Sequence, residues 1–149
     1  MVVFPFEHGG EQYRLGPMIC YEDILPDLGR KLAEHHPHLL INITNDAWFG
    51  RSSAPHQHFA EAVVRAVENG RWVVRAANTG VSGIISPSGR VVARSGLDEV
   101  RLLEGTVFAR QNRTVYGRIG DGFAWACAII SAVLLALPGY VLPPPSPPG

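Results

Sequence analysis

The sequence has few cysteines, no excess of either charge and no basic leader. Its two cysteines are Cys20 and Cys127, and the second lies in a strongly apolar segment, so we expect no disulfide between them. Thirteen basic and thirteen acidic residues give a formal net charge of zero, which argues against a nucleic-acid partner. The stretch MVVFPFEHGGEQ lacks a basic start followed by a long apolar run, so it does not indicate a secretory signal.

The sequence also lacks the spacing of two common kinds of catalytic site. Several histidines could be metal ligands, but Pro37 interrupts them and no cysteine or acid recurs at a regular interval. We therefore predict no metal and no cofactor. We interpret these histidines as surface or capping residues: His35, His36, His38, His56 and His58. The stretch TGVSGI does not have the Gly-x-Ser-x-Gly spacing, so no serine hydrolase is indicated.

A long uncharged segment lies near the carboxyl end. Residues 123–137, FAWACAIISAVLLAL, carry no charge, and the uncharged stretch continues to Leu142. About twenty helical residues span roughly 30 Å, the thickness of a bilayer's hydrocarbon core, and no polar stripe is present to face water. We predict a transmembrane helix over residues 119–142 and a disordered proline-rich tail over residues 143–149. The alternative is a buried core helix, because Pro138 would end the helix too early to span a bilayer.

Residues 1–118, upstream of this segment, alternate between strand and helix patterns. Helices are predicted from Asp23 to about His35 and from about Pro55 to Asn69, each with one apolar face. The predicted strands are EQYRLGPMIC, HLLINIT, WVVRAA, VSGIIS and VVARS. This order is typical of an α/β domain with a hairpin-rich second half.

Cys20 lies at the predicted carboxyl end of the first of these strands, directly before a helix. Side chains at this edge of an α/β sheet project into a crevice lined by loops. The partial positive charge of a helix amino terminus favours the thiolate over the thiol. The position therefore suits a nucleophile, but a free cysteine is also a common inert core residue. Position alone leaves both interpretations open.

Residues near Cys20 add further candidates. The backbone N–H of Tyr21 can point at the oxyanion of an acyl intermediate. Glu22 could act on a proton near the thiol, although its charge would also repel a thiolate. The loop NDAWFG follows the next strand and ends at the same sheet edge if the two strands are parallel neighbours. It supplies candidate substrate-binding residues, although loop aromatics can equally cover the core: Asn45, Asp46, Trp48 and Phe49.

Several motifs together resemble one family. They are ICYED, INITNDAWFG, the long stretch APHQHFAEAVVRAVENGRWVVRAANTGVSGIISPSGRVV and the final apolar segment. In this order they are similar to the carboxyl-terminal part of the apolipoprotein N-acyltransferases, membrane members of the nitrilase (carbon–nitrogen hydrolase) superfamily. The similarity covers about residues 10 to 140. It implies part of an α-β-β-α sandwich, followed by one transmembrane helix.

The resemblance also implies an activity and a location. Cys20 would take an acyl chain from a phospholipid as a thioester and pass it to the amino-terminal diacylglyceryl-cysteine of an apolipoprotein. Glu22 matches a pocket glutamate that assists the nucleophile, and Trp48 and Phe49 match an active-site loop. The complete enzyme would cross the bacterial inner membrane several times, with its catalytic domain on the periplasmic side.

The sequence departs from the family pattern before Cys20. The family's general-base glutamate and oxyanion-stabilising lysine precede the cysteine strand, but here no lysine precedes Lys31. Neither Glu7 nor Glu11 stands in the expected context. We therefore expect residues 1–149 to be inactive by themselves. A nitrilase-like amidase acting on a small amide, and a non-catalytic remnant or subunit, are the alternative hypotheses.

Overall fold

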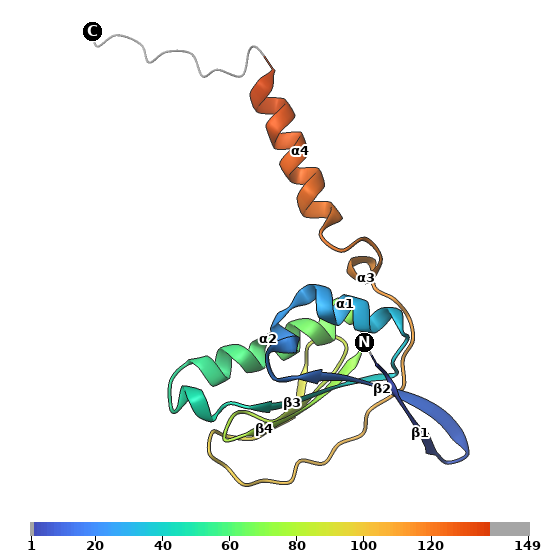
Figure 1. The fold of residues 1–149 in the computed structure, drawn as a ribbon, viewed down its shortest axis with the longest axis vertical. Coiled ribbons are helices and arrows are strands. Elements are labelled where there is room, and N and C mark those ends of the chain that lie inside the picture. Colours follow the sequence, from blue (N-terminus) through green and yellow to red (C-terminus); the bar gives the residue numbers. More distant parts are fainter. Residues whose placement is uncertain (1, 138–149) are drawn as a thin grey trace. The chain divides into compact units, whose positions relative to one another are not determined.

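The computed structural model describes residues 2–137, and the chain divides into two units, Met1–Arg118 and Ile119–Gly149. Strands and helices alternate along the first unit (Figure 1). The strands are β1 (Phe4–His8), β2 (Glu11–Ile19), β3 (Leu39–Asn45), β4 (Trp72–Asn78), β5 (Gly83–Ile85) and β6 (Val91–Arg94). The α-helices are α1 (Pro26–Glu34), α2 (Ala54–Asn69), α3 (Val115–Ile119) and α4 (Gly122–Ala136). Two short 3₁₀ helices, η1 (Cys20–Ile24) and η2 (Ala47–Phe49), follow β2 and β3.

The six strands form one sheet in the order β1-β2-β3-β4-β5-β6. Strands β2, β3 and β4 are parallel neighbours, whereas β1, β5 and β6 pair antiparallel with theirs. Parallel neighbours need a long crossover connection, and α1 and α2 provide the two that join β2 to β3 and β3 to β4. Ile19 therefore stands opposite Ile43, and Asn45 stands opposite Asn78. The carboxyl ends of three strands meet at one sheet edge.

The hydrophobic core lies between the sheet and the two helices α1 and α2, which cover one of its faces (Figure 1). Strand β3 alternates as a half-buried strand does, with Leu40, Asn42 and Thr44 buried and Ile43 exposed. The core cluster combines residues of both layers: Met18, Leu32, Leu40, Phe59, Ala62, Ala66, Val73, Val81 and Ile85. The domain thus has one helical layer and one sheet layer, with the predicted α/β character.

Most predicted elements are present, with two differences at the start of the domain. Strand β1 is not among the predicted strands. The helix predicted from Asp23 begins as α1 at Pro26, because the 3₁₀ helix η1 takes up the residues before it. Leu25 has extended backbone (φ −94°, ψ 104°), the conformation that a following proline favours. The chain therefore turns twice between β2 and α1.

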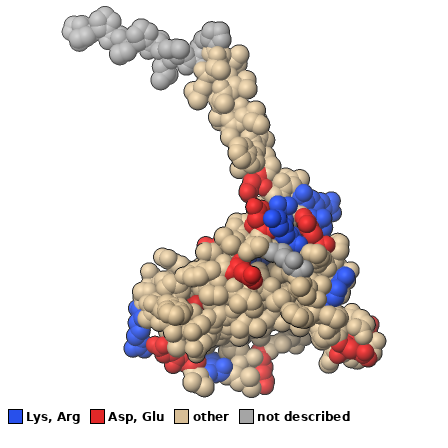
Figure 2. Space-filling view, viewed as in Figure 1, with Lys and Arg blue, Asp and Glu red and all other residues tan. Residues whose placement is uncertain are grey.

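The second unit contains α4, a helix of fifteen residues that is exposed along its length and has no charged side chain (Figure 2). Within residues 2–137, no helix is both long enough and apolar enough to cross a bilayer. The transmembrane prediction over residues 119–142 is therefore not confirmed, and its last five residues lie outside the described part of the chain. The predicted tail over residues 143–149 lies outside it as well.

Candidate active site

Cys20 is the first residue of η1 and directly follows β2, where the chain turns. Its φ is 52°, in the left-handed region that residues with a Cβ atom rarely adopt. The Glu22 carboxylate closes this turn, because its Oε2 accepts a hydrogen bond of 2.7 Å from the Ile19 N–H. A strained backbone of this kind persists only where surrounding contacts hold it. We call this turn, residues 19–22, the cysteine turn.

A buried asparagine supports the cysteine turn from the neighbouring strand. The Asn42 side-chain amide on β3 donates hydrogen bonds of 3.2 Å to the carbonyl oxygens of Met18 and Cys20. Its own oxygen accepts a hydrogen bond of 2.6 Å from Arg75 Nη1 on β4, which fixes the orientation of the amide. Asn42 therefore holds the Cys20 carbonyl, and Arg75 holds Asn42.

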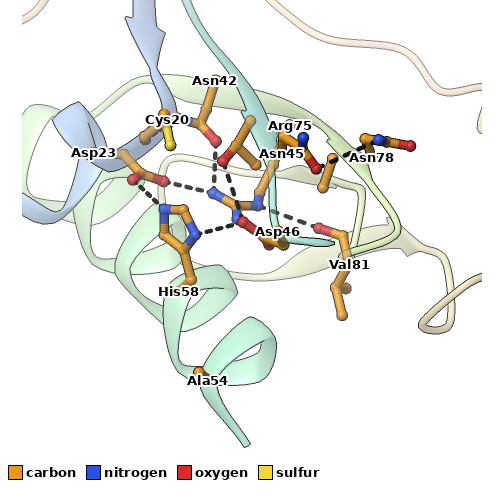
Figure 3. A network of polar contacts seen from close by, with 12 residues as sticks. Cys20, Asp23, Asn42, Asn45, Asp46, Ala54, His58, Arg75, Asn78 and Val81 are labelled. Atoms are coloured by element: carbon orange, nitrogen blue, oxygen red, sulfur yellow. Dashed lines mark hydrogen bonds and ion pairs between the residues drawn. The ribbon is translucent and has the colours of Figure 1, made fainter. Parts of the chain in front are cut away.

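A buried cluster of four charged side chains lies next to the cysteine turn (Figure 3). We call Asp23, Asp46, His58 and Arg75 the charge cluster. Arg75 reaches both acids, with 2.7 Å to Asp23 Oδ2 and 2.9 Å to Asp46 Oδ2. His58 also reaches both, with Nε2 at 2.8 Å from Asp23 Oδ1 and Nδ1 at 2.9 Å from Asp46 Oδ1. Each carboxylate is thus shared by the same two basic groups.

The charge cluster determines the protonation of His58. Burial lowers the pKa of His58 and the Arg75 charge lowers it too, but the hydrogen bonds to Asp23 and Asp46 and the Asp23 charge outweigh both. The pKa of His58 is therefore raised above its ordinary value. Ionised carboxylates only accept hydrogen bonds, so both ring nitrogens of His58 must carry a proton. The two contacts with carboxylates and the raised pKa of His58 both favour the imidazolium form.

Aromatic side chains cover the charge cluster on the side of Tyr21. The Tyr21 ring stacks on the His58 ring at 5.0 Å between centroids and 21° between planes. Phe49 packs edge-on against Tyr21 at 5.9 Å. These three rings, with Ile24, Ala54, Gln57 and Glu61, line a pocket of about 320 Å³. A second pocket of about 300 Å³ has Ile19 and Glu22 in its wall.

A larger pocket of about 480 Å³ lies away from Cys20, between Tyr13, Leu39 and Phe108. Leu39 is the first residue of β3, so this pocket is at the amino ends of the parallel strands. Ligands of open α/β sheets bind outside the carboxyl ends of the strands. We therefore place the candidate active site at Cys20 and not in the larger pocket.

Comparison with known proteins identifies the family. Residues 1–112 match the family model described as carbon-nitrogen hydrolase. The chain belongs to the carbon–nitrogen hydrolase family. A carbon-nitrogen hydrolase from Helicobacter pylori G27 has the same fold, with a TM-score of 0.52 at 16% identity over 59% of this chain and 38% of that one.

Two curated proteins that are similar to this chain are named apolipoprotein N-acyltransferase. The protein from Geobacter metallireducens is 48% identical over 124 residues, which are 83% of this chain and 24% of that protein. The one from Pseudomonas aeruginosa PAO1 is 40% identical over 134 residues, which are 89% of this chain and 25% of that protein. The chain thus spans about a quarter of the length of these relatives.

The structure brings the predicted site residues to one edge of the sheet, with different accessibility. Cys20 is half-buried, Tyr21 is 45% exposed and Trp48 is 84% exposed. Phe49 lines the pocket of Tyr21. Asn45 is exposed, and its Oδ1 accepts hydrogen bonds from the Ala47 N–H and from the Asn78 side chain (Figure 3). The catalytic and binding roles of these residues stay predictions.

One interpretation from the sequence is wrong, and one predicted binding residue is buried. His58 is not a surface or capping residue, because it is 4% exposed and both ring nitrogens bind carboxylates. Asp46 is 1% exposed, with Oδ1 bound to His58 and Oδ2 bound to Arg75, and its role in substrate binding stays a prediction. The Asp46 carboxylate forms ion pairs inside the domain, whereas its loop neighbours Trp48 and Phe49 remain accessible.

The charge cluster is not predicted from the sequence, although two features of the sequence indicate it. Arg75 interrupts an otherwise apolar strand, and a buried charge needs a buried partner of opposite sign. His58 stands four residues before Ala62, in line with the buried face of α2. The strand pattern predicts that Arg75 is buried, and the helix face predicts that His58 is buried. A basic side chain at a buried position predicts an internal ion pair. Neither position identifies the partner.

Proposed function

We propose that this chain carries the nucleophile of an apolipoprotein N-acyltransferase. Cys20 takes an acyl chain from a phospholipid and passes it to the α-amino group of a diacylglyceryl-cysteine on an apolipoprotein. The observation that supports this is a free thiol held by strained backbone at the carboxyl ends of the parallel strands β2, β3 and β4. The same chain is 48% identical to a relative with that name.

The proposed reaction proceeds in two acyl-transfer steps. The Cys20 thiolate attacks the ester carbonyl of the phospholipid, the ester C–O bond breaks, and the released alkoxide takes a proton. The amine then attacks the thioester carbonyl, the C–S bond breaks, the amine loses a proton, and the thiolate is restored. Both steps pass through a tetrahedral oxyanion. Amide N–H groups in the first turn of a helix have no intrahelical acceptor, so the Tyr21 N–H in η1 can donate to it.

Glu22 acts in this proposal by holding the cysteine turn. Its carboxylate accepts the Ile19 N–H hydrogen bond and so fixes the backbone on the amino side of Cys20. The pocket walls at Tyr21 and Phe49 are apolar surfaces suited to an acyl chain. No lysine precedes Cys20, so we propose that residues 1–149 alone do not complete the transfer.

We further propose that the uncharged segment anchors the chain in a bacterial inner membrane, with the α/β domain on the periplasmic side. Support comes from α4, whose side chains are exposed and uncharged on all sides. Such a surface is costly in water and favourable among lipid tails.

Charged substitutions in α4 test this membrane proposal. A lysine at the centre of a membrane helix costs about 2.5–3.5 kcal/mol, so Ile130→Lys with Leu134→Lys should release the chain from sedimented membranes. The matched variant Ile130→Leu with Leu134→Ile should remain in the membrane fraction. Equal sedimentation of the lysine variant and the parent would exclude anchoring by α4.

A chimera tests the acyl-transfer proposal. This chain replaces the segment that it matches in the Geobacter metallireducens relative, and the purified chimera is incubated with phospholipid vesicles and a diacylglyceryl-cysteine peptide. We expect mass spectrometry to show a peptide with one added acyl chain. A short aliphatic amide offered in a parallel reaction should yield little carboxylic acid. Amide hydrolysis without peptide acylation would favour a nitrilase-like amidase and contradict the proposal.

A further inference from the structure

The net charge of the charge cluster depends on the protonation of His58. Asp23 and Asp46 contribute two negative charges, and Arg75 supplies one positive charge. All four side chains are almost completely buried, where an uncompensated charge is strongly unfavourable. The cluster is neutral only when His58 is an imidazolium.

The geometry excludes His58 as a general base. Its Nδ1 and Nε2 both lie within hydrogen-bond distance of carboxylate oxygens, so neither nitrogen is free to accept a proton from Cys20 or a substrate. The ring face is also occupied, because Tyr21 stacks on it. His58 therefore acts through its charge and its contacts.

Two connections join His58 to the nucleophile. The stacked Tyr21 is the residue directly after Cys20, and Asp23, bound to Nε2, lies in the same short helix η1. On the other side of the cluster, Arg75 orients Asn42, whose amide binds the Cys20 carbonyl (Figure 3). A change in the charge or position of His58 would therefore alter the surroundings of Cys20 through η1 and through Asn42.

We propose that His58 is a positioning residue for Cys20: as an imidazolium between Asp23 and Asp46, it keeps the charge cluster neutral and holds Tyr21 in place. The inference rests on the proposed role of Cys20 as nucleophile. Without the imidazolium charge, the cluster carries a net charge of −1 next to the cysteine turn. A nearby negative charge disfavours the thiolate and so makes the nucleophile weaker at neutral pH.

The charged and titratable groups that face His58 come from several elements. They are Tyr21 and Asp23 on η1, Asp46 after β3, Arg75 on β4 and, on the same helix, Glu61. The Glu61 carboxylate is partly exposed and lies 3.8 Å from Arg65 Nη2. Its effect on His58 is therefore screened by solvent and by a neighbouring positive charge.

Nitrogen NMR of the unaltered full chain in detergent gives a direct test. Long-range ¹H–¹⁵N spectra distinguish an imidazolium, with two protonated nitrogens, from a neutral ring with one. We expect His58 to show two protonated nitrogens at pH 7.5. The exposed His56 on the same helix provides an internal reference in the same spectrum. A neutral His58 ring at this pH would overturn the inference, whether or not any variant folds.

Thiol reactivity then tests the effect on Cys20. Cys127→Ser provides a background with Cys20 as the single thiol, and its alkylation rate by iodoacetamide is measured against pH. In this background, His58→Gln should raise the pH midpoint by about one unit, because the cluster becomes negative. His58→Gln combined with Asp23→Asn restores neutrality and should return the midpoint towards that of the background. His56→Gln, the matched control, should leave it unchanged.

The outcomes separate this inference from the proposed function. A folded His58→Gln chain with an unshifted midpoint would overturn the charge-balancing role. A raised midpoint that Asp23→Asn does not lower would show a packing effect alone and overturn it as well. These measurements involve no acyl transfer. A chimera without transferase activity would contradict the proposed function while these results stand.

Discussion

Cys20→Ser in the chimera is expected to lower phospholipid-dependent acyl transfer by about 10³-fold or more, since removing a nucleophile removes the covalent route. Serine is close in size to cysteine and retains the same strained φ of 52°, so the fold should persist. The rate of peptide acylation by mass spectrometry measures the loss, and circular dichroism verifies the fold.

Cys127→Ser is the matched control for this prediction. Cys127 lies on the exposed helix α4, and the same substitution there should leave acyl transfer within about twofold of the parent. Incubation with a radiolabelled phospholipid should also leave a hydroxylamine-sensitive thioester on the parent and on Cys127→Ser, but not on Cys20→Ser. Acylation of the peptide by the Cys20→Ser chimera would remove Cys20 from the mechanism.

Arg75→Met is expected to destabilise the full chain by about 3–5 kcal/mol, the typical cost of breaking a buried ion pair. Methionine can fill part of the volume, but Asp23 and Asp46 would then share only His58 as a positively charged partner. Asn42 would also lose the donor that orients its amide. Urea unfolding followed by circular dichroism gives the change in the free energy of unfolding.

Arg51→Met controls for the loss of an arginine as such. The Arg51 side chain is 82% exposed and pairs with Asp98 at 3.4 Å, so its removal should cost less than about 1 kcal/mol. If the two variants were equally stable, the charge cluster would not hold the domain together. Asp46→Asn added to Arg75→Met should recover part of the loss, because it removes the negative charge that His58 does not compensate.

Local rules account for much of the fold. An almost continuous apolar run predicts β3, and an apolar helix face with Gly70 at its end predicts α2. The prediction of α1 is displaced by three residues, since the Pro26 constraint on Leu25 allows η1 to form separately. Strand β1 is missed because its pairing with β2, rather than its own pattern, makes it a strand.

The placement of Cys20 at a strand end also follows from the sequence, because an apolar run meets acids and a proline there. The charge cluster does not follow. Asp23 and Arg75 are 52 positions apart, and Asp23 and His58 are 35 apart. Their meeting requires the parallel register that sets Asn42 opposite Arg75, and the packing of α2 over that face.

By itself, the sequence determined the alternating elements, the strand end that carries the thiol and the motifs of the carbon–nitrogen hydrolase family. These depend on neighbouring residues, because backbone periodicity and turn chemistry act over a few positions. Strand register and helix packing turn Asp46 and His58 inward, where they complete a neutral cluster with Asp23 and Arg75. Charges separated along the chain can be paired only after strand register and helix packing have fixed which side chains share one buried space.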